Sequence, residues 1–246
     1  MKLTENTVLI TGGSSGIGLS LAKSFLELNN KVIITGRNLE KLEEVKKQLP
    51  NISTFQCELT NQNSMNELVV FIEQKFPDLN ILLNNAAIQY NYSFNDCGNV
   101  IDKIDYEINA NLTAPIKLTS LLLPILLKND ESAVINVSSG LAISPKKSAS
   151  VYCATKSAIH SFTKSLRYQL KDTTVKVFEI IPPLVDTPMT SGRGKTKKIT
   201  PDQLTKEFLK NFQAEKFESY IGKSKILRFI HRLSPKLADK IMQDGI

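Results

Sequence analysis

Short apolar runs alternate with segments of helical periodicity along this chain, and that alternation narrows the fold more than any other feature. The runs are rich in β-branched residues, as strands buried on both faces are, and they lie at 7–10, 31–35, 52–56, 80–84, 133–137 and 175–180. Helical segments separate them, with two long ones expected near 100–128 and 151–171. This order predicts an α/β fold in which helices cover both faces of a central parallel sheet and ligands gather at the carboxyl ends of the strands.

Length and composition bound the organisation of the chain. With 246 residues it is long enough for one substantial core, and we expect a single domain over 1–246. Within it we expect a cofactor and catalytic core at 4–190, a substrate loop and helix at 188–222, and a basic helical tail at 223–246. No signal peptide or membrane span is readable, and the three cysteines lack metal-ligand spacing. We therefore expect a cytoplasmic protein with buried thiols and no metal site.

The charge of the chain is concentrated in its last quarter. The whole formal net charge of +7 lies in residues 191–246, because the preceding residues carry equal numbers of basic and acidic side chains. A phosphate-bearing substrate, an anionic membrane surface or simple solubility could each explain this tail. Within it, Thr200, Pro201 and Gln203 mark the start of a helix. Nucleic-acid binding is disfavoured, since the tail lacks interleaved aromatic residues and any recognisable module.

A glycine-spaced turn, Thr11-Gly-Gly-Ser-Ser-Gly-Ile-Gly18, follows the first expected strand. Gly12 permits a tight turn, Gly16 lets the backbone approach a pyrophosphate, and Gly18 lets the following helix pack closely on the strand. The helix N-terminus adds N–H groups and a partial positive charge for phosphate. Such spacing is common in α/β folds, but its place after the first strand is typical of a doubly wound Rossmann fold that binds a dinucleotide.

The end of the second expected strand indicates which dinucleotide fits. A carboxylate there would bind the ribose 2′-hydroxyl of NAD, whereas an arginine accommodates the 2′-phosphate of NADP. The chain reads Thr35-Gly36-Arg37, with glycine in the carboxylate position and arginine beside it. Arg37 could simply be a solvated side chain, but the missing carboxylate favours NADP(H) as the cofactor.

Tyr152 and Lys156 lie four residues apart, thirteen residues after Ser139. Four residues make about one helical turn, so the phenol and the ammonium share one helix face. A neighbouring cation favours phenolate, and we therefore expect Lys156, together with the positive nicotinamide ring of a bound cofactor, to lower the pKa of Tyr152 toward neutrality. The tyrosine would then serve as a general acid or base, and beside a dinucleotide turn it indicates hydride transfer.

Several motifs occur together in a fixed order, and through them the chain resembles the short-chain dehydrogenase/reductase family over residues 4–190. They are the glycine turn, Asn84-Asn85-Ala86-Ala87, Asn111, Ser138-Ser139, Tyr152-x-x-x-Lys156 and Pro182-Pro-Leu-Val-Asp-Thr187. Segments 185–193 and 233–245 also resemble a narrower group named after DltE, which is associated with D-alanine esterification of teichoic acids. Each motif alone is ordinary; their joint order is not.

The resemblance implies a role for each motif. Tyr152 would protonate the carbonyl oxygen in reduction while Ser139 hydrogen-bonds that oxygen. Lys156 would hold the nicotinamide ribose, and Asn111 would kink its helix and hold a water that links Lys156 to solvent. The implied catalytic residues are Asn111, Ser139, Tyr152 and Lys156. The implied cofactor-binding residues are Gly12, Ser14, Ser15, Gly16, Ile17, Gly18, Arg37, Glu58, Leu59, Asn85, Ala86, Tyr152, Lys156, Pro182, Val185 and Thr187.

We therefore expect an NADP(H)-dependent oxidoreductase that interconverts a small-molecule carbonyl and a secondary alcohol. Two alternatives stay open: a 3-oxoacyl thioester reductase, and an accessory protein of teichoic acid D-alanylation that binds cofactor and an anionic membrane surface. Membrane contact is the less favoured interpretation of the tail. The basic residues Arg193, Lys195, Lys197 and Lys198 would suit an anionic substrate. The resemblance also implies a homodimer or homotetramer, and we expect no nucleic-acid partner.

Overall fold

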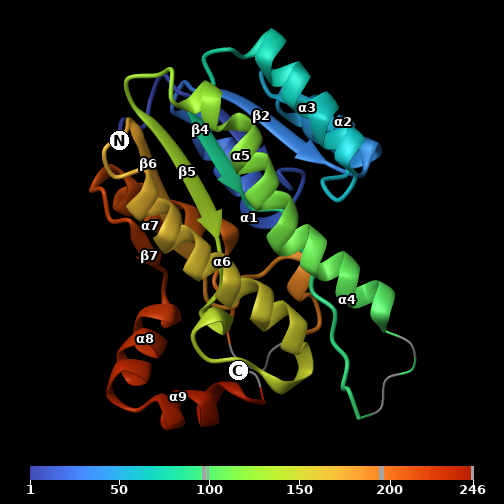
Figure 1. Ribbon diagram of the computed structural model, residues 1–246, viewed down its shortest axis with the longest axis vertical. Helices are drawn as coiled ribbons and strands as arrows, with labels where there is room; N and C mark the ends of the chain where they lie inside the picture. Colours follow the sequence, from blue (N-terminus) through green and yellow to red (C-terminus); the bar gives the residue numbers. More distant parts are fainter. Residues whose placement is uncertain (96–97, 99, 194–196, 245–246) are drawn as a thin grey trace.

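A parallel sheet of seven strands forms the centre of the computed structural model (Figure 1), which describes residues 1–95, 98, 100–193 and 197–244. The strands lie in the order β3-β2-β1-β4-β5-β6-β7, and all neighbouring pairs are parallel. Their bounds are β1 (Thr7–Thr11), β2 (Lys31–Gly36), β3 (Ser53–Gln56), β4 (Ile81–Asn84), β5 (Ser132–Val137), β6 (Val175–Ile181) and β7 (Glu218–Tyr220). The predicted doubly wound Rossmann fold is confirmed.

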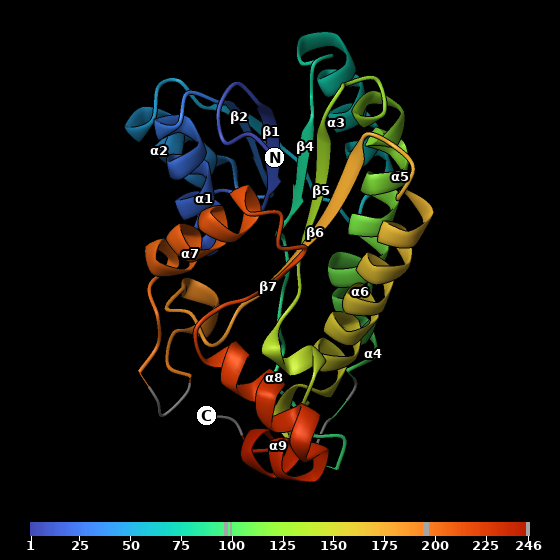
Figure 2. The ribbon, with the colours of Figure 1, turned by 90° about the vertical axis from the view of Figure 1, so that its left-hand side faces the viewer.

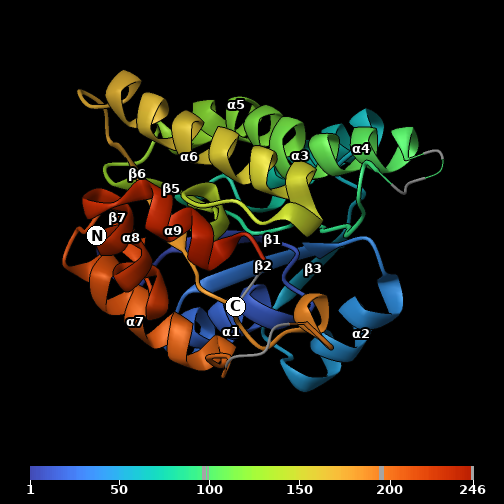
Figure 3. The same cartoon turned by 90° about the horizontal axis from the view of Figure 1, so that it is seen from below.

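Helices cover both faces of this sheet (Figure 3). Val8 and Ile10 of β1 face the core shared with α1, α2 and α7, whereas Leu9 faces the core shared with α3, α5 and α6. Successive strand side chains point to opposite faces, so a strand with a core on each side must be apolar throughout. The α-helices are α1 (Gly16–Glu27), α2 (Leu39–Gln48), α3 (Gln62–Lys75), α4 (Ile101–Ile108), α5 (Ala114–Leu126), α6 (Ser150–Gln169), α7 (Pro201–Gln213), α8 (Lys223–Leu233) and α9 (Pro235–Met242).

Shorter helical turns complete the fold and mark its functional edge. They are the π turn η1 (Asn109–Thr113) and the 3-10 turns η2 (Gly140–Ala142), η3 (Lys147–Ala149) and η4 (Pro188–Thr190). The order of the strands reverses between β1 and β4, since the chain runs outward from β1 to β3 and then returns to β4. Crevices at such a switch point are where doubly wound folds bind ligands.

Two features of the fold differ from the sequence-based expectation. The long helical stretch near 100–128 is divided by η1 into α4 and α5, and a seventh strand, β7, pairs with β6. The capping box predicted at Thr200 and Gln203 is present at the start of α7. Lys195 of the expected substrate loop lies outside the described residues. None of the helices in the described ranges has the length and hydrophobicity needed to cross a bilayer.

Candidate active site

The glycine turn between β1 and α1 forms a cradle that side chains would obstruct. Gly12 and Gly16 adopt left-handed backbone conformations, with φ of 64° and 54°. A Cβ at Gly12 would lie 2.9 Å from the Cα of Ala86, and one at Gly16 would lie 3.1 Å from the Thr187 side chain. The backbone can therefore come as close to a ligand as the pyrophosphate of a dinucleotide requires.

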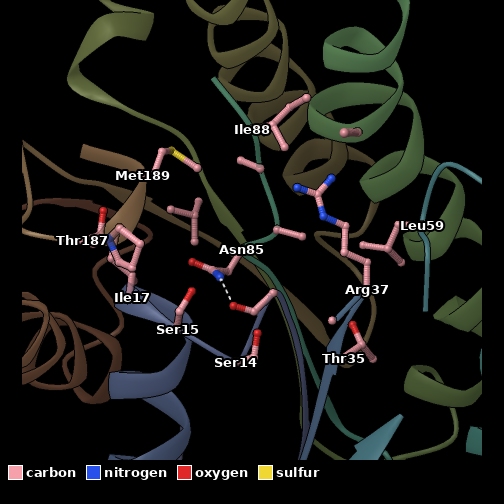
Figure 4. Close-up of a pocket in the computed structure, with 18 of the residues that line it drawn as sticks. Ser14, Ser15, Ile17, Thr35, Arg37, Leu59, Asn85, Ile88, Thr187 and Met189 are labelled. Atoms are coloured by element: carbon pink, nitrogen blue, oxygen red, sulfur yellow. Dashed lines mark hydrogen bonds between the residues drawn. The ribbon is translucent and has the colours of Figure 1, made fainter. Parts of the chain in front are cut away.

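Hydrogen bonds from the segment directly after β4 hold this cradle in place, and Figure 4 shows one of them, made by Asn85. The Asn85 Nδ2 donates to the carbonyl oxygens of Thr11 and Gly12, at 3.0 and 3.1 Å. In return, the Thr11 hydroxyl accepts from the backbone N–H groups of Asn85 and Ala86, at 3.0 and 3.1 Å. Asn85 thus fixes the turn from the neighbouring strand and lines the same cleft.

A cleft of about 320 Å³ opens at the carboxyl ends of the strands. Of the residues implied as cofactor-binding, it is lined by Gly12, Ser14, Ser15, Gly16, Ile17, Arg37, Glu58, Leu59, Asn85, Ala86, Tyr152, Lys156, Pro182 and Thr187. Two implied residues lie outside this lining. Gly18 is buried in α1, where a Cβ would meet the Gly12 oxygen at 2.4 Å, so it serves helix packing. Val185 packs into the core and lines the neighbouring cavity instead.

Arg37 points into this cleft (Figure 4), where a chain of hydrogen bonds holds it. Its Nη1 donates to the Tyr106 hydroxyl at 2.8 Å, and that hydroxyl donates to the Glu58 Oε2 at 3.0 Å. The other Glu58 oxygen accepts from the N–H and the hydroxyl of Thr60. Burial and the carboxylate both raise the pKa of Tyr106, so it stays a neutral donor. Tyr106, on α4, also lines the cleft, although no sequence motif marked it.

Tyr152 and Lys156 lie on α6 as the spacing predicted, and both are buried, with 8% and 3% of their surface exposed. The Lys156 Nζ lies 5.7 Å from the centre of the tyrosine ring and donates to the Val137 carbonyl oxygen at 2.8 Å. Burial lowers the pKa of Lys156 to about 8. The expectation of a lowered pKa for Tyr152 is wrong for the protein chain itself. Burial raises this pKa, and a hydrogen bond with Ser139 only partly opposes the rise.

Ser139 follows β5 and faces a second cavity of about 480 Å³. Its hydroxyl caps η2 by accepting from the Leu141 N–H at 3.1 Å. Both cavities are lined by Tyr152, by Pro182 and Thr187 after β6, and by Ile17 and Met189. The phenol therefore stands where the glycine-lined cleft and the second cavity meet.

Asn111 lies in the π turn, where the resemblance implied a kinked helix. Its side chain bonds both backbone groups of Ile88 at 2.8 Å and donates to the Thr155 hydroxyl at 3.3 Å. Asn111 is 1% exposed, and neither cavity is lined by it. It links the segment after β4 to the residue beside Lys156, which is a positioning role.

Charged groups surround the second cavity. Arg193 and Lys146 line it, and burial and the neighbouring guanidinium lower the pKa of Lys146. The Arg193 Nη2 donates to the Gln89 carbonyl oxygen at 3.2 Å, whereas its Nη1 is buried without a partner among the described residues. Glu107 is buried nearby, and burial raises its pKa. The described residues contain no cluster of three or more side chains suited to a metal ion.

His160 does not face either cavity. Its Nδ1 lies 2.9 Å from Oε2 of Glu179, a carboxylate of β6 with no exposed surface. That hydrogen bond raises the pKa of His160 above its ordinary value. The pair ties α6 to strand β6 of the sheet.

Comparison with known proteins adds family membership to this geometry. Residues 6–198 match the family model described as short chain dehydrogenase. The chain is 49% identical over 187 residues to the uncharacterized oxidoreductase DltE of Bacillus subtilis (strain 168), covering 76% of this chain and 74% of that protein. It is 32% identical over 211 residues to an uncharacterized oxidoreductase of Staphylococcus aureus (strain USA300), covering 84% and 90%.

Solved structures share the architecture throughout. A short chain dehydrogenase from Burkholderia cenocepacia J2315 in complex with NADP matches with a TM-score of 0.88 at 22% identity, over 99% of this chain and 100% of that chain. A 3-ketoacyl-(acyl-carrier-protein) reductase from Brucella melitensis complexed with NADH matches with a TM-score of 0.80 at 25% identity, over 85% and 91%. By the match of the family model and of these relatives, the chain belongs to the short-chain dehydrogenase family.

Proposed function

We propose that this protein is a cytosolic NADP(H)-dependent oxidoreductase that interconverts a carbonyl and a secondary alcohol. The observation that carries the proposal is the meeting of two cavities at Tyr152. The first has the glycine cradle that a pyrophosphate requires, and the second has a largely apolar lining with Ser139 beside the phenol. A hydride donor and a carbonyl compound could therefore reach the same hydroxyl from two sides.

The proposed chemistry assigns each buried polar group a task. NADPH, when bound, supplies the hydride for the carbonyl carbon. Tyr152 donates its proton to the carbonyl oxygen, and the Ser139 hydroxyl hydrogen-bonds that oxygen as its charge develops. Burial keeps the phenol protonated, which suits an acid in the direction of reduction. Lys156 would hold the ribose of the cofactor, and Asn111 would keep α6 and the segment after β4 in register.

This assignment predicts how the two directions respond to pH. Reduction needs the phenol, so its rate should stay level between about pH 6 and 8, below the raised pKa of Tyr152. Oxidation needs the phenolate, whose fraction rises about tenfold per pH unit below that pKa, so its rate should climb with pH. Measurement of kcat in both directions over this range checks the assignment, and a falling oxidation rate would contradict it.

The preference for NADP(H) rests on Arg37. The guanidinium lines the cleft directly after β2, where Gly36 leaves no carboxylate to bind a ribose 2′-hydroxyl. The carboxylate of Glu58 faces Tyr106 and Thr60. A 2′-phosphate would meet a cation with donors in a fork, which is the geometry that binds phosphate well.

The substrate would carry an anionic group. Three cations, Lys146, Arg193 and Lys223, line the second cavity together with one carboxylate, Asp244, which forms an ion pair with Lys147. The Nη1 of Arg193 is buried without a partner among the described residues. Lys198 does not share this role, because its Nζ donates to the Thr190 carbonyl oxygen and pairs with Asp186 at 3.5 Å. A 3-oxoacyl thioester reductase is a second candidate, since Leu141, Leu227 and Met242 give the cavity an apolar wall for an acyl chain.

We also propose that the protein forms a homodimer or homotetramer through α5 and α6. Leu121 of α5 and Leu127, which directly follows that helix, are 37% and 43% exposed, and Tyr168 of α6 is 68% exposed. Large apolar side chains exposed on two neighbouring helices are typical of subunit interfaces. Light scattering of the purified protein would measure the mass, and a monomer at micromolar concentration would contradict this proposal.

Removal of the Tyr152 hydroxyl group tests the proposed reaction. Tyr152→Phe should lower kcat by at least about a hundredfold, because the proton donor is lost while the ring and its packing remain. Tyr168→Phe on the same helix is the matched control and should retain activity, because it keeps the ring that would contact a neighbouring subunit. The assay is a screen of neutral and anionic ketones, including 3-oxoacyl thioesters, followed by NADPH fluorescence. Turnover that survives in the Tyr152→Phe variant would overturn the proposed mechanism.

A further inference from the structure

Helices α8 and α9 contact each other at one end of the molecule (Figures 1 and 2). Both helices expose large apolar side chains. On α8, Ile226, Phe229 and Leu233 are 60%, 63% and 70% exposed. Their spacing of i, i+3 and i+7 places them on one face of the helix. On α9, Leu237 and Ile241 are 49% and 40% exposed and lie one turn apart. We call these five side chains the outer apolar face.

A separate cluster of side chains packs the two helices on the protein. It consists of Leu227, Ala238 and Met242, which pack with Leu141 and Ile230. Since these residues neighbour the exposed ones in sequence, they lie about a quarter turn around each helix. Each helix therefore has a buried apolar side next to an apolar side that faces solvent. Apolar patches exposed in this way mark interaction sites.

Basic side chains flank the outer apolar face and indicate what it contacts. The two helices and the residues up to 244 carry six Lys or Arg and two Asp, and the six are Lys223, Lys225, Arg228, Arg232, Lys236 and Lys240. Lys225 and Arg228 form ion pairs with Glu207 and Glu218. In the part of the chain that the structure describes, the other four form no salt bridge. Lys223 lines the second cavity, so the charge of Arg232, Lys236 and Lys240 is the part that an anionic partner of this face could meet.

We infer that the outer apolar face docks on an anionic lipid surface. A helix of 11 residues is too short to cross a bilayer, but its apolar side chains can enter the boundary between headgroups and acyl chains. Flanking lysines and arginines then lie at the depth of the lipid phosphates. A second copy of the chain is a poorer partner, because a twofold contact through this face would set like charges opposite each other. The inference does not depend on the reaction proposed above.

Co-sedimentation of the full chain with vesicles tests this inference. Vesicles of phosphatidylglycerol should bind the wild type at low salt, whereas phosphatidylcholine vesicles should bind it at least about tenfold more weakly, and added salt should weaken binding to the former. The double variant Phe229→Ser, Leu233→Ser should lower the partition coefficient about tenfold or more. Val70→Ser on α3 is the matched control, since Val70 is 48% exposed and distant in sequence, and it should bind as the wild type does.

Three results would overturn the inference. The first is no binding of the wild type to anionic vesicles, and the second is undiminished binding of the double variant. The third is a change in oligomeric mass caused by the double variant in light scattering, which would make the face a contact between copies. Thermal unfolding of each variant separates loss of binding from loss of fold, and substitutions at such exposed positions should leave the melting temperature nearly unchanged.

Discussion

The hydroxyl of Tyr106 fixes the guanidinium of Arg37 over the cleft, and removing it should weaken binding of NADPH more than binding of NADH. Arg37 donates to this hydroxyl at 2.8 Å, and the hydroxyl donates to Glu58 at 3.0 Å. Tyr106→Phe keeps the ring and its packing and removes only these two hydrogen bonds. Arg37 is then free to leave the position in which it would meet a 2′-phosphate.

The size of the effect follows from what each group contributes. The hydrogen bond from the Arg37 guanidinium to Tyr106 orients Arg37 and does not itself touch the cofactor. Its loss should therefore cost NADPH binding only about 0.5–1.5 kcal/mol, which raises the Kd about three- to tenfold. Arg37→Leu removes the charge-assisted contact itself, worth about 1.5–3 kcal/mol, and should raise that Kd from about tenfold to over a hundredfold. Glu58→Gln should have the opposite sign, because it removes a negative charge near the site of the phosphate.

Fluorescence titration of each variant with NADPH and with NADH measures the two dissociation constants without turnover. The ratio of the constants is the informative quantity, and Tyr168→Phe serves as the control for loss of a tyrosine hydroxyl at an exposed position. Equal weakening of both cofactors by Tyr106→Phe would show that the hydroxyl only supports packing. If Arg37→Leu also leaves the ratio unchanged, the assignment of NADP(H) itself fails.

Three further outcomes follow from contacts in the structure. Gly18→Ala should destabilise the protein by about 1–3 kcal/mol in denaturant unfolding, because the new Cβ would lie 2.4 Å from the Gly12 oxygen; unchanged stability would contradict the close packing. His160→Gln should lose stability relative to wild type most at acidic pH. Glu179 raises the pKa of His160 in the folded protein, so protonated His160 stabilises the fold fully below about pH 6.5. This stabilisation declines as the pH rises through the pKa of His160 in the folded protein. Melting curves across pH check this sign. Arg193→Leu should raise KM about tenfold for an anionic ketone and leave KM for a neutral ketone unchanged, and equal effects on both would refute an anion site.

The sheet was predictable because each central strand must be apolar on both faces. A run such as Val8-Leu9-Ile10 is buried on both faces when it forms a central strand, with Val8 and Ile10 in one core and Leu9 in the other. The positions of such runs agree with the observed strands. Strand β7 was not predictable in this way, since Glu218-Ser219-Tyr220 is short and only partly apolar. Its pairing with β6 depends on contacts made far away in the sequence. The π turn at Asn109–Thr113 likewise leaves no periodic signal, because one extra residue in a helix shifts the stripe only slightly.

The cofactor cleft was predictable wherever the backbone sets a steric requirement. Positions 12 and 16 require glycine because their backbone is left-handed and other atoms lie close to them. The sequence shows this requirement as the regular spacing of glycines after the first strand. Tyr106 and Lys146 were missed because they reach the site from segments without a motif, and only the packing of α4 and of the loop before α6 brings them there. The pKa of Tyr152 was predicted in the wrong direction because spacing on a helix reports proximity to Lys156 and says nothing of burial.

The protonation states of Tyr152 and Lys156 are set by the burial of both side chains. Burial penalises the charged form of both partners, so it raises the pKa of Tyr152 and lowers that of Lys156 to about 8. In the protein without ligand, Tyr152 is therefore a neutral phenol. Lys156 loses its proton more readily than an exposed lysine does. A charge brought by a ligand would shift these pKa values, and the oxidised nicotinamide ring is cationic whereas the reduced ring is neutral. A cation near Tyr152 favours phenolate, the base for oxidation, and its absence leaves phenol, the acid for reduction. The buried pair would therefore match the protonation state of the tyrosine to the redox state of the cofactor.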